Sequence, residues 1–154
     1  MIKRRADGGF DLNLDDERRE VLTLLLRDLL AQIDAAPDHP NLVRLSPPAY
    51  LDDPDADAAY QLLAGEELRT SHRTAIEAVI SSLDRKRLTE PEAWAWIQSL
   101  NAVRLVAGTR LDISEDDHGP FGRRPAASPE ERSLWAIYDF TTLLQHEVVE
   151  ALSA

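Results

Sequence analysis

The sequence has no cysteine in its 154 residues. Disulfides, thiolate nucleophiles, thiolate metal sites and cysteine-based redox sensing are therefore excluded for this chain. A metal ion would have to be held by carboxylates and by the four histidines. The six glycines form no phosphate-binding loop, no dinucleotide fingerprint and no nucleophile elbow. Because no reaction signature is present, we expect a non-enzymatic protein with no cofactor and no catalytic residues.

Long hydrophobic runs are also missing. No stretch of about 18 apolar residues occurs, so the sequence predicts no membrane-spanning helix. Lys3, Arg4 and Arg5 near the N-terminus are followed by Asp7 and two glycines and not by an apolar segment, so we expect no signal peptide. A cytoplasmic protein is the resulting expectation.

Basic residues are scarce compared with acidic ones. The chain has 17 Lys and Arg against 28 Asp and Glu, a formal net charge of -11. This charge repels a phosphate backbone unless a local basic patch overrides it. It suits a basic protein partner, and it suits equally well a chain whose acids only maintain solubility.

The N-terminal segment predicts a β-hairpin over residues 1–14. Asp7, Gly8 and Gly9 supply the positive φ angles that tight hairpin turns need. A two-stranded ribbon alone is only marginally stable. We therefore expect the hairpin to lie on the helices or to pair with another strand.

Most of the remaining chain has the three-to-four-residue apolar spacing of helices. The first helix is predicted to begin near Asp15 and to end before Pro37. Residues 36–57 are rich in proline, but Leu42, Val43, Leu45, Tyr50 and Leu51 give this segment apolar anchors. We interpret it as a strap that packs over the core.

Four further helices are predicted. A short helix follows Asp53 and Pro54 and ends at Gly65, and another spans residues 66–84. Two capping boxes, at residues 89–92 and 128–131, open the last two helices. Residues 112–127 between them are polar and predict a surface loop. The sequence therefore predicts a mainly α, single-domain bundle of about five helices with a short N-terminal β-hairpin.

One segment favours nucleic acid. Arg69, His72 and Arg73 lie in an acid-free stretch after the helix–Gly65–helix pattern, which can be interpreted as a helix-turn-helix. The competing interpretation is the polar face of an amphipathic helix, because glutamates flank the stretch and few cations are present. Direct DNA binding is accordingly the first alternative function, and we expect it less than protein binding.

Two acidic patterns resemble metal sites. Asp53, Asp55 and Asp57 copy the start of an EF-hand calcium loop, but alanines occupy its required glycine and glutamate positions. His146 and Glu150 share a helix face with the spacing of a zinc-protease helix, without a visible third ligand. A metal-dependent enzyme built from His and carboxylates is therefore the second alternative, and we expect no metal.

The most apolar helix holds two tryptophans and two arginines. Trp94 and Trp96 begin a stretch that is apolar around most of its circumference, which predicts a central helix. Arg104 and Arg110 lie in it and need carboxylate or carbonyl partners if they are buried. We expect the acidic start of the first helix to supply those partners. For Arg104 and Arg110 a structural ion pair is favoured over a partner-binding site, and Trp94 and Trp96 belong to the same candidate segment.

Three stretches together indicate a family. They are "DLNLDDERREVLTLLLRDLLAQI", "LVRLSPPAYLDDPDADAAYQLL" and "WAWIQSLNAVRLVAGTRLDI", with the most specific part between Leu100 and Arg110. The chain resembles the actinobacterial family catalogued as a domain of unknown function and associated with the actinomycete oxidative stress regulator AosR. Redox sensing in that family is attributed to a cysteine pair, which this chain lacks.

The resemblance implies a small regulator that acts on transcription through a protein partner, in an oxidative stress response. A sigma factor, or another transcription component, is the partner that it implies, and a basic DNA-binding protein would complement the acidic charge. We also expect a homodimer, because two-fold dimers are the commonest oligomers.

Overall fold

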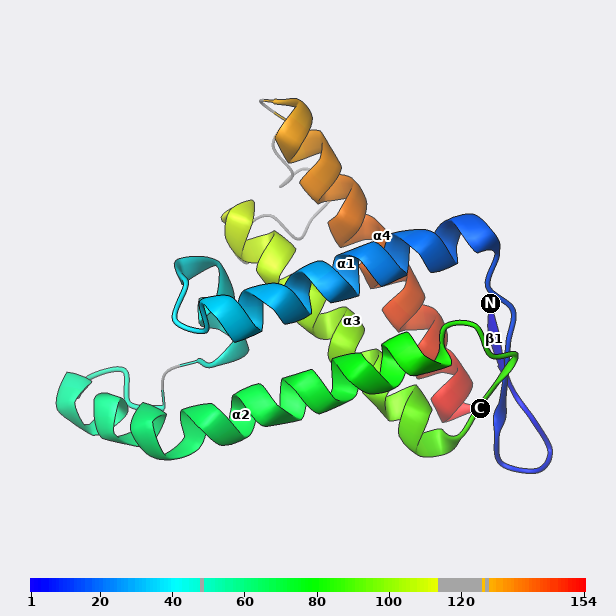
Figure 1. The fold of residues 1–154 in the computed structure, drawn as a ribbon, viewed down its shortest axis with the longest axis horizontal. Helices are drawn as coiled ribbons and strands as arrows, with labels where there is room; N and C mark the ends of the chain where they lie inside the picture. The colour runs from blue at the N-terminus through cyan, green and yellow to red at the C-terminus, as the bar shows by residue number, and fades with distance from the viewer. Residues whose placement is uncertain (48, 114–125, 127) are drawn as a thin grey trace.

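The computed structural model describes residues 1–47, 49–113, 126 and 128–154. It confirms the predicted mainly α single domain (Figure 1). Within the described residues, four α-helices and one 3-10 helix accompany a small antiparallel sheet. In chain order the elements are β1 (Ile2–Arg4), β2 (Phe10–Leu12), α1 (Asp16–Ala35), the 3-10 helix η1 (Pro40–Leu45), α2 (Pro54–Ser82), β3 (Arg87–Leu88), α3 (Glu90–Arg110) and α4 (Pro129–Ser153).

Helix α3 forms the centre of the fold, as predicted. It packs against α4, α2, η1 and α1, and Figure 1 shows it crossing behind α1 and α2. Trp96, Leu100 and Ala102 are buried on it. A helix that is apolar around its circumference can only be stable with neighbours on most sides.

The hairpin is present and carries a third strand that the sequence analysis missed. Arg4 of β1 faces Phe10 of β2, and Phe10 in turn faces Leu88 of β3. Two residues are too short a strand to produce a detectable alternating pattern. The added strand supplies the pairing that the ribbon needed, because an isolated two-stranded hairpin is marginal.

The predicted helix starts are confirmed by their caps. The Asp15 side chain accepts a hydrogen bond from the backbone N–H of Arg18 at 2.8 Å. The hydroxyls of Thr89 and Ser128 cap α3 and α4 in the same way. These side chains satisfy N–H groups that have no partner within the helix.

Helix α2 corrects one prediction. It runs without a break through Gly65, where the sequence analysis had ended one helix and begun another. Glycine in a helix interior costs about 1 kcal/mol relative to alanine, which ends a helix only when no good helix formers follow. Leu62, Leu63, Glu66 and Glu67 surround Gly65, and the helix continues. The turn of the proposed helix-turn-helix therefore does not exist.

The predicted strap is confirmed in position but only in part in its anchors. Leu42 and Leu45 of η1 are buried, and η1 packs against α3. Val43, Tyr50 and Leu51 are exposed, so their assignment as anchors was wrong. A 3-10 helix has three residues per turn, which puts residues 42 and 45 on one side and 43 on another. The strap also ends earlier than predicted, because residues 54–57 form the first turn of α2.

The predicted surface loop over residues 112–127 falls mostly outside the described residues. At its start, Leu111 and Ile113 are buried beside Leu134 and Trp135 of α4. This second apolar cluster packs the C-terminal end of α3 against the N-terminal part of α4.

Candidate functional site

The Arg104 side chain lies in the contact between α3 and α4. Its Nη1 donates to Oε1 of Gln145 at 2.9 Å. Its guanidinium carbon is 5.4 Å from the ring centroid of Tyr138, which permits a cation–π contact. Among the described residues Arg104 forms no ion pair. The expected carboxylate from the start of α1 was therefore wrong: the partners are an amide oxygen and a ring, both on α4.

The other three residues of that prediction separate in space. Arg110 pairs with Glu130 in the first turn of α4 at 2.9 Å, and both side chains are solvent-accessible. Trp96 is fully buried, and its indole N–H donates to the Ser82 hydroxyl at 2.9 Å. Trp94 is 55% exposed. Two residues apart on a helix are about 200° apart around its axis, so only one of the two tryptophans can face the core.

The three candidate nucleic-acid contacts face the protein. His72 Nε2 bonds the carbonyl oxygen of Leu45 at 3.2 Å. The Arg73 guanidinium forms an ion pair with Asp34 of α1. Arg69 lies against Gly65 and lines a cavity. The helix-turn-helix interpretation thus loses its turn, and its three candidate side chains have partners or neighbours within the protein.

The candidate metal ligands have other roles. Asp53 caps α2 by accepting from the N–H of Ala56 at 3.1 Å. His146 Nε2 and Glu150 Oε1 are 3.7 Å apart on the exposed face of α4. Over the described ranges, no three His, Asp or Glu side chains lie close enough together to hold a metal ion.

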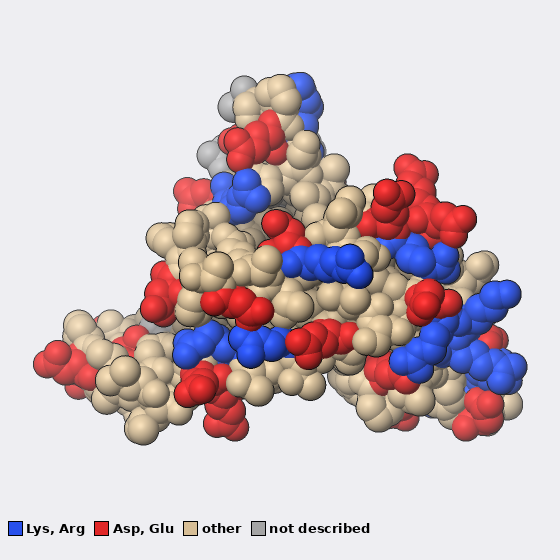
Figure 2. Space-filling model, viewed as in Figure 1, with Lys and Arg blue, Asp and Glu red and all other residues tan. Residues whose placement is uncertain are grey.

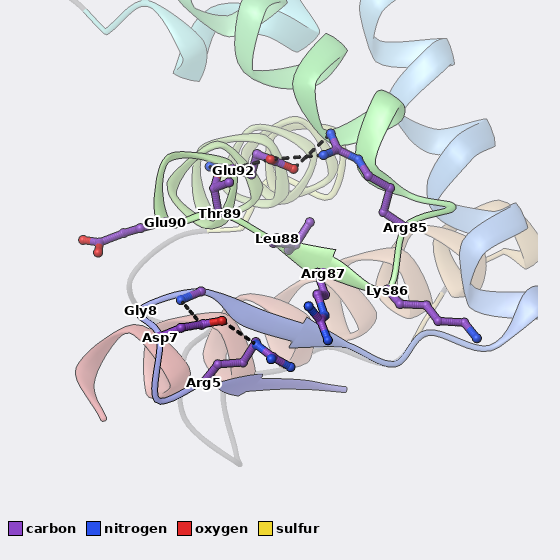
Figure 3. A pocket seen from close by; sticks show the side chains of 11 residues that line it. Arg5, Asp7, Gly8, Arg85, Lys86, Arg87, Leu88, Thr89, Glu90 and Glu92 are labelled. Atoms are coloured by element: carbon purple, nitrogen blue, oxygen red, sulfur yellow. Dashed lines mark hydrogen bonds and ion pairs between the residues drawn. The ribbon is translucent and has the colours of Figure 1, made fainter.

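A shallow hollow of about 810 Å³ lies between the hairpin turn and the segment that joins α2 to α3 (Figure 3). Arg5 donates to Asp7 at 3.2 Å and to Asp11 at 2.8 Å. The hydrogen bonds that Arg5 donates to Asp11 and to Asp7 raise the pKa of Arg5. The Asp7 carboxylate accepts hydrogen bonds from the backbone N–H of Gly9 and from Arg5. These bonds, the first more than the second, lower the pKa of Asp7. These charged groups therefore bond to one another and to the backbone within the hairpin.

The opposite wall of the hollow likewise carries both positive and negative side chains. Arg85 forms an ion pair with Glu92 at 3.1 Å, and the side chain of the next residue, Lys86, extends away from the hairpin turn (Figure 3). Figure 2 shows blue and red atoms mixed at this end of the molecule. The hollow is a surface of mixed charge without an assembled set of catalytic groups.

A different surface stands out at the N-terminal end of α2, which extends away from the other helices (Figure 1). Leu51, Leu62 and Leu63 are 82%, 86% and 85% exposed. Tyr50, 51% exposed, contacts Tyr60 edge to face. We call this surface the α2 tip; it consists of Tyr50, Leu51, Leu62 and Leu63, with Asp52, Asp53 and Asp55 alongside in the sequence.

The sequence analysis did not find the α2 tip. Its sequence signal is that two adjacent leucines stand next to Gln61, whose amide bonds the Ser46 hydroxyl at 2.6 Å on the inner face. One and two residues further along a helix, side chains are rotated by about 100° and 200°, so Leu62 and Leu63 lie off the face that Gln61 presents to Ser46. Their exposure itself follows from the tertiary structure.

The described structure is that of a small mainly α protein with an exposed acidic and apolar surface at the α2 tip. No helix in the described part of the chain is long and apolar enough to cross a membrane. The chain belongs to the domain of unknown function family DUF2017, whose sequence model matches residues 1–152. The resemblance noted from the sequence is thereby confirmed.

Curated relatives come from mycobacteria. The AosR protein of Mycobacterium leprae is 33% identical over 167 aligned residues, which cover 95% of this chain and 75% of that protein. The oxidative stress regulators AosR of Mycobacterium bovis and Mycobacterium tuberculosis are 32% identical over 136 residues. Those matches cover 75% of this chain and only 59% of each relative. No solved structure shows significant similarity to the chain.

Proposed function

We propose that this chain is a non-enzymatic regulatory protein that acts by binding another protein in the response to oxidative stress. The partner is a basic component of the transcription machinery, with a sigma factor as the leading candidate. The names of the mycobacterial relatives support the regulatory part of this proposal. The structure supports the binding part through the α2 tip.

The exposure of the α2 tip is the observation that carries the proposal. Three leucines above 80% exposure lie at one end of one helix and its approach segment. Single exposed apolar residues need no explanation, but gathered ones mark contact surfaces. The carboxylates of residues 52, 53 and 55 give the surroundings a negative potential, which steers basic partners toward it.

The signal reaches this chain by a route other than its own thiols, because none of its 154 residues is a cysteine. The methionine at position 1 is its only sulfur. The oxidative signal is accordingly placed in the partner or in a ligand. Moderate peroxide treatment should leave the fold and the affinity for the partner unchanged. A change in either one that dithiothreitol reverses would contradict this expectation.

The test is binding of the purified chain to a panel of purified actinobacterial sigma factors, measured by calorimetry at low and at high salt. We expect one member to bind, with affinity that falls as salt rises. Replacing both Leu62 and Leu63 with serine should weaken binding about tenfold or more, as loss of central apolar contacts does.

The matched control is Leu24→Ser, on α1, where the leucine is 64% exposed and away from the tip. It should bind as the unchanged protein does. Equal binding by the tip variant and the control would refute the α2 tip as the contact surface. Failure of every sigma factor to bind would refute the proposed partner.

Two other occupants are measured with the same samples. Light scattering at high micromolar concentration that gives twice the chain mass, with loss of the dimer in the tip variant, would assign the surface to a second copy. A gel shift with DNA that weakens steeply with salt would show direct phosphate contacts instead.

A further inference from the structure

A cavity of about 410 Å³ lies between the C-terminal end of α1, η1 and the middle of α2. Its apolar walls include Ile33 of α1, Leu42 and Leu45 of η1, and Leu68 of α2. Small-molecule sites typically measure about 300–1,000 Å³ and combine apolar walls with a few polar groups. The cavity is therefore large enough for a compact organic molecule.

Gly65 keeps the cavity open. It lies on the lining face of α2, and apart from the helix's own backbone the described residues place one atom within 4 Å of an added Cβ, Nη1 of Arg69 at 3.4 Å. Alanine would be more stable by about 1 kcal/mol in an ordinary helix interior. A longer side chain at this position would project into the space that the glycine leaves.

One charged group of the lining has no partner within the described residues. Arg69 forms neither an ion pair nor a hydrogen bond there, whereas Arg73 one turn later is paired with Asp34. His72 Nε2 bonds the Leu45 carbonyl, which requires the proton on Nε2. Nδ1 of the same ring has almost no accessible surface, so a ligand in the cavity does not reach it.

The other polar groups of the lining are engaged or face water. Asp57 Oδ1 accepts from the N–H groups of Ala49 and Tyr50 at 2.7 and 3.3 Å. Gln61 bonds Ser46. Asp38 is exposed, so water and salt screen its charge. His39 is exposed as well, and its Nδ1 accepts from the Asn41 N–H at 3.0 Å. The Arg69 guanidinium remains for a ligand.

We propose that this cavity binds a small organic acid. Its apolar ring or chain lies between η1 and α2, and its carboxylate receives hydrogen bonds from the guanidinium of Arg69. Guanidinium and carboxylate match each other as planar groups with two parallel hydrogen bonds. This ligand site goes beyond the proposed partner binding and does not depend on it.

The test uses 6-hydroxy-2-naphthoate and 2-naphthol, which differ by one carboxylate, with binding measured by calorimetry on the full chain. We expect the acid to bind about tenfold or more tightly than the alcohol, because a charge-assisted bidentate pair is among the stronger hydrogen bonds. Arg69→Leu should remove that difference and leave the affinity for 2-naphthol unchanged. Gly65→Leu should abolish binding of both compounds.

Glu66→Leu is the matched control, since it adds the same side chain at the exposed neighbouring position. It should bind both compounds as the unchanged protein does. Circular dichroism and thermal melting test whether Gly65→Leu is folded. If Gly65→Leu does not fold, Gly65→Ala, which adds one methyl group, fills less of the cavity and takes its place. Equal affinity of the unchanged protein for the two compounds, absence of any binding, or unweakened binding by the folded filling variants would overturn the proposal.

Discussion

Helix α3 and the first half of α2 use their residues in opposite ways. In α3, eight residues are buried, and Arg104, the cation on its inner face, is bonded across to α4. Of residues 54–72 in α2, only the glycine at position 65 is buried, and two leucines point into solvent. Both segments are regular helix, so the difference lies in packing and not in local conformation.

This difference shows where stability and recognition are located. Burial of apolar area is the main favourable contribution to folding, and α3 supplies it on several sides. The first half of α2 leaves apolar area in water and encloses a cavity, both of which lower stability. Regions of low local stability are where ligand and partner contacts are commonly found. We therefore place both proposed interactions on α2.

Trp96→Ala should have the largest effect, because it removes a fully buried side chain from the contact between α3 and the end of α2. Such substitutions typically cost about 3–5 kcal/mol. Trp94→Ala removes an exposed ring from the same helix and should stay within about 0.5 kcal/mol. Urea unfolding followed by circular dichroism measures both, and equal losses would contradict the inward and outward assignment.

Arg104→Ala should lower the free energy of unfolding by about 1–2 kcal/mol, since it removes one hydrogen bond from a charged donor and a cation–π contact. This expected loss is smaller than the roughly 3–5 kcal/mol that removing one partner of a buried ion pair costs. Arg110→Ala, which removes an exposed pair, should change the value by about 0.5 kcal/mol or less. Thermal melting of both variants checks this order. An Arg104→Ala protein that melts like the parent but no longer binds its partner would make Arg104 a contact residue.

The two helical glycines offer a direct comparison of the regions. Gly65→Ala should raise the free energy of unfolding by about 0.4–1 kcal/mol, because the added methyl meets only one atom at an ordinary distance. At Gly108 an added Cβ would lie 3.0 Å from Nη1 of Arg44. Arg44 is fixed by a 2.6 Å hydrogen bond from its Nη2 to the Ile113 carbonyl. Gly108→Ala should therefore show no gain, and a matching rise in melting temperature for both would contradict this.

The smallest effect is expected at Asp7, on the exposed hairpin turn. Its lowered pKa means that the carboxylate stabilises the fold above the pKa of the unfolded chain, and that this contribution is lost as the pH falls through the lower pKa of the folded state. Asp7→Asn should lose that acid-side pH dependence and increase amide exchange at Gly9. NMR titration measures the pKa and the exchange. A Gly9 exchange rate unchanged by the substitution would contradict the bond that they share.

Much of the fold was predictable because the relevant signals are local. Asp15, Thr89 and Ser128 cap their helices through hydrogen bonds within three residues of the chain. The hairpin follows from its glycine turn, where Gly8 has a φ of 90°. Strand β3 was missed because two residues are too short to show an alternating pattern. The course of α2 through Gly65 was missed although good helix formers stand on both sides of that glycine.

The candidate site residues were less predictable. Arg104 was expected to be structural, yet its partners, Gln145 and Tyr138, lie about forty residues further along and carry no charge. Arg69 and His72 were candidate nucleic-acid contacts in the less expected alternative, and in the structure they line a cavity beside η1. Charge and spacing identify residues that need partners, and they do not identify the partners.

By itself the sequence determined that the chain lacks thiols, carries a strong negative charge and folds mainly into helices with defined starts. These properties depend on composition and on interactions between residues close together in the chain. Tertiary structure alone decided that Trp96 is buried and Trp94 exposed, that Leu62 and Leu63 remain in water, and that a cavity forms over Gly65. The physical reason is that burial depends on which helices meet, and helix contacts are set by the packing of the whole chain.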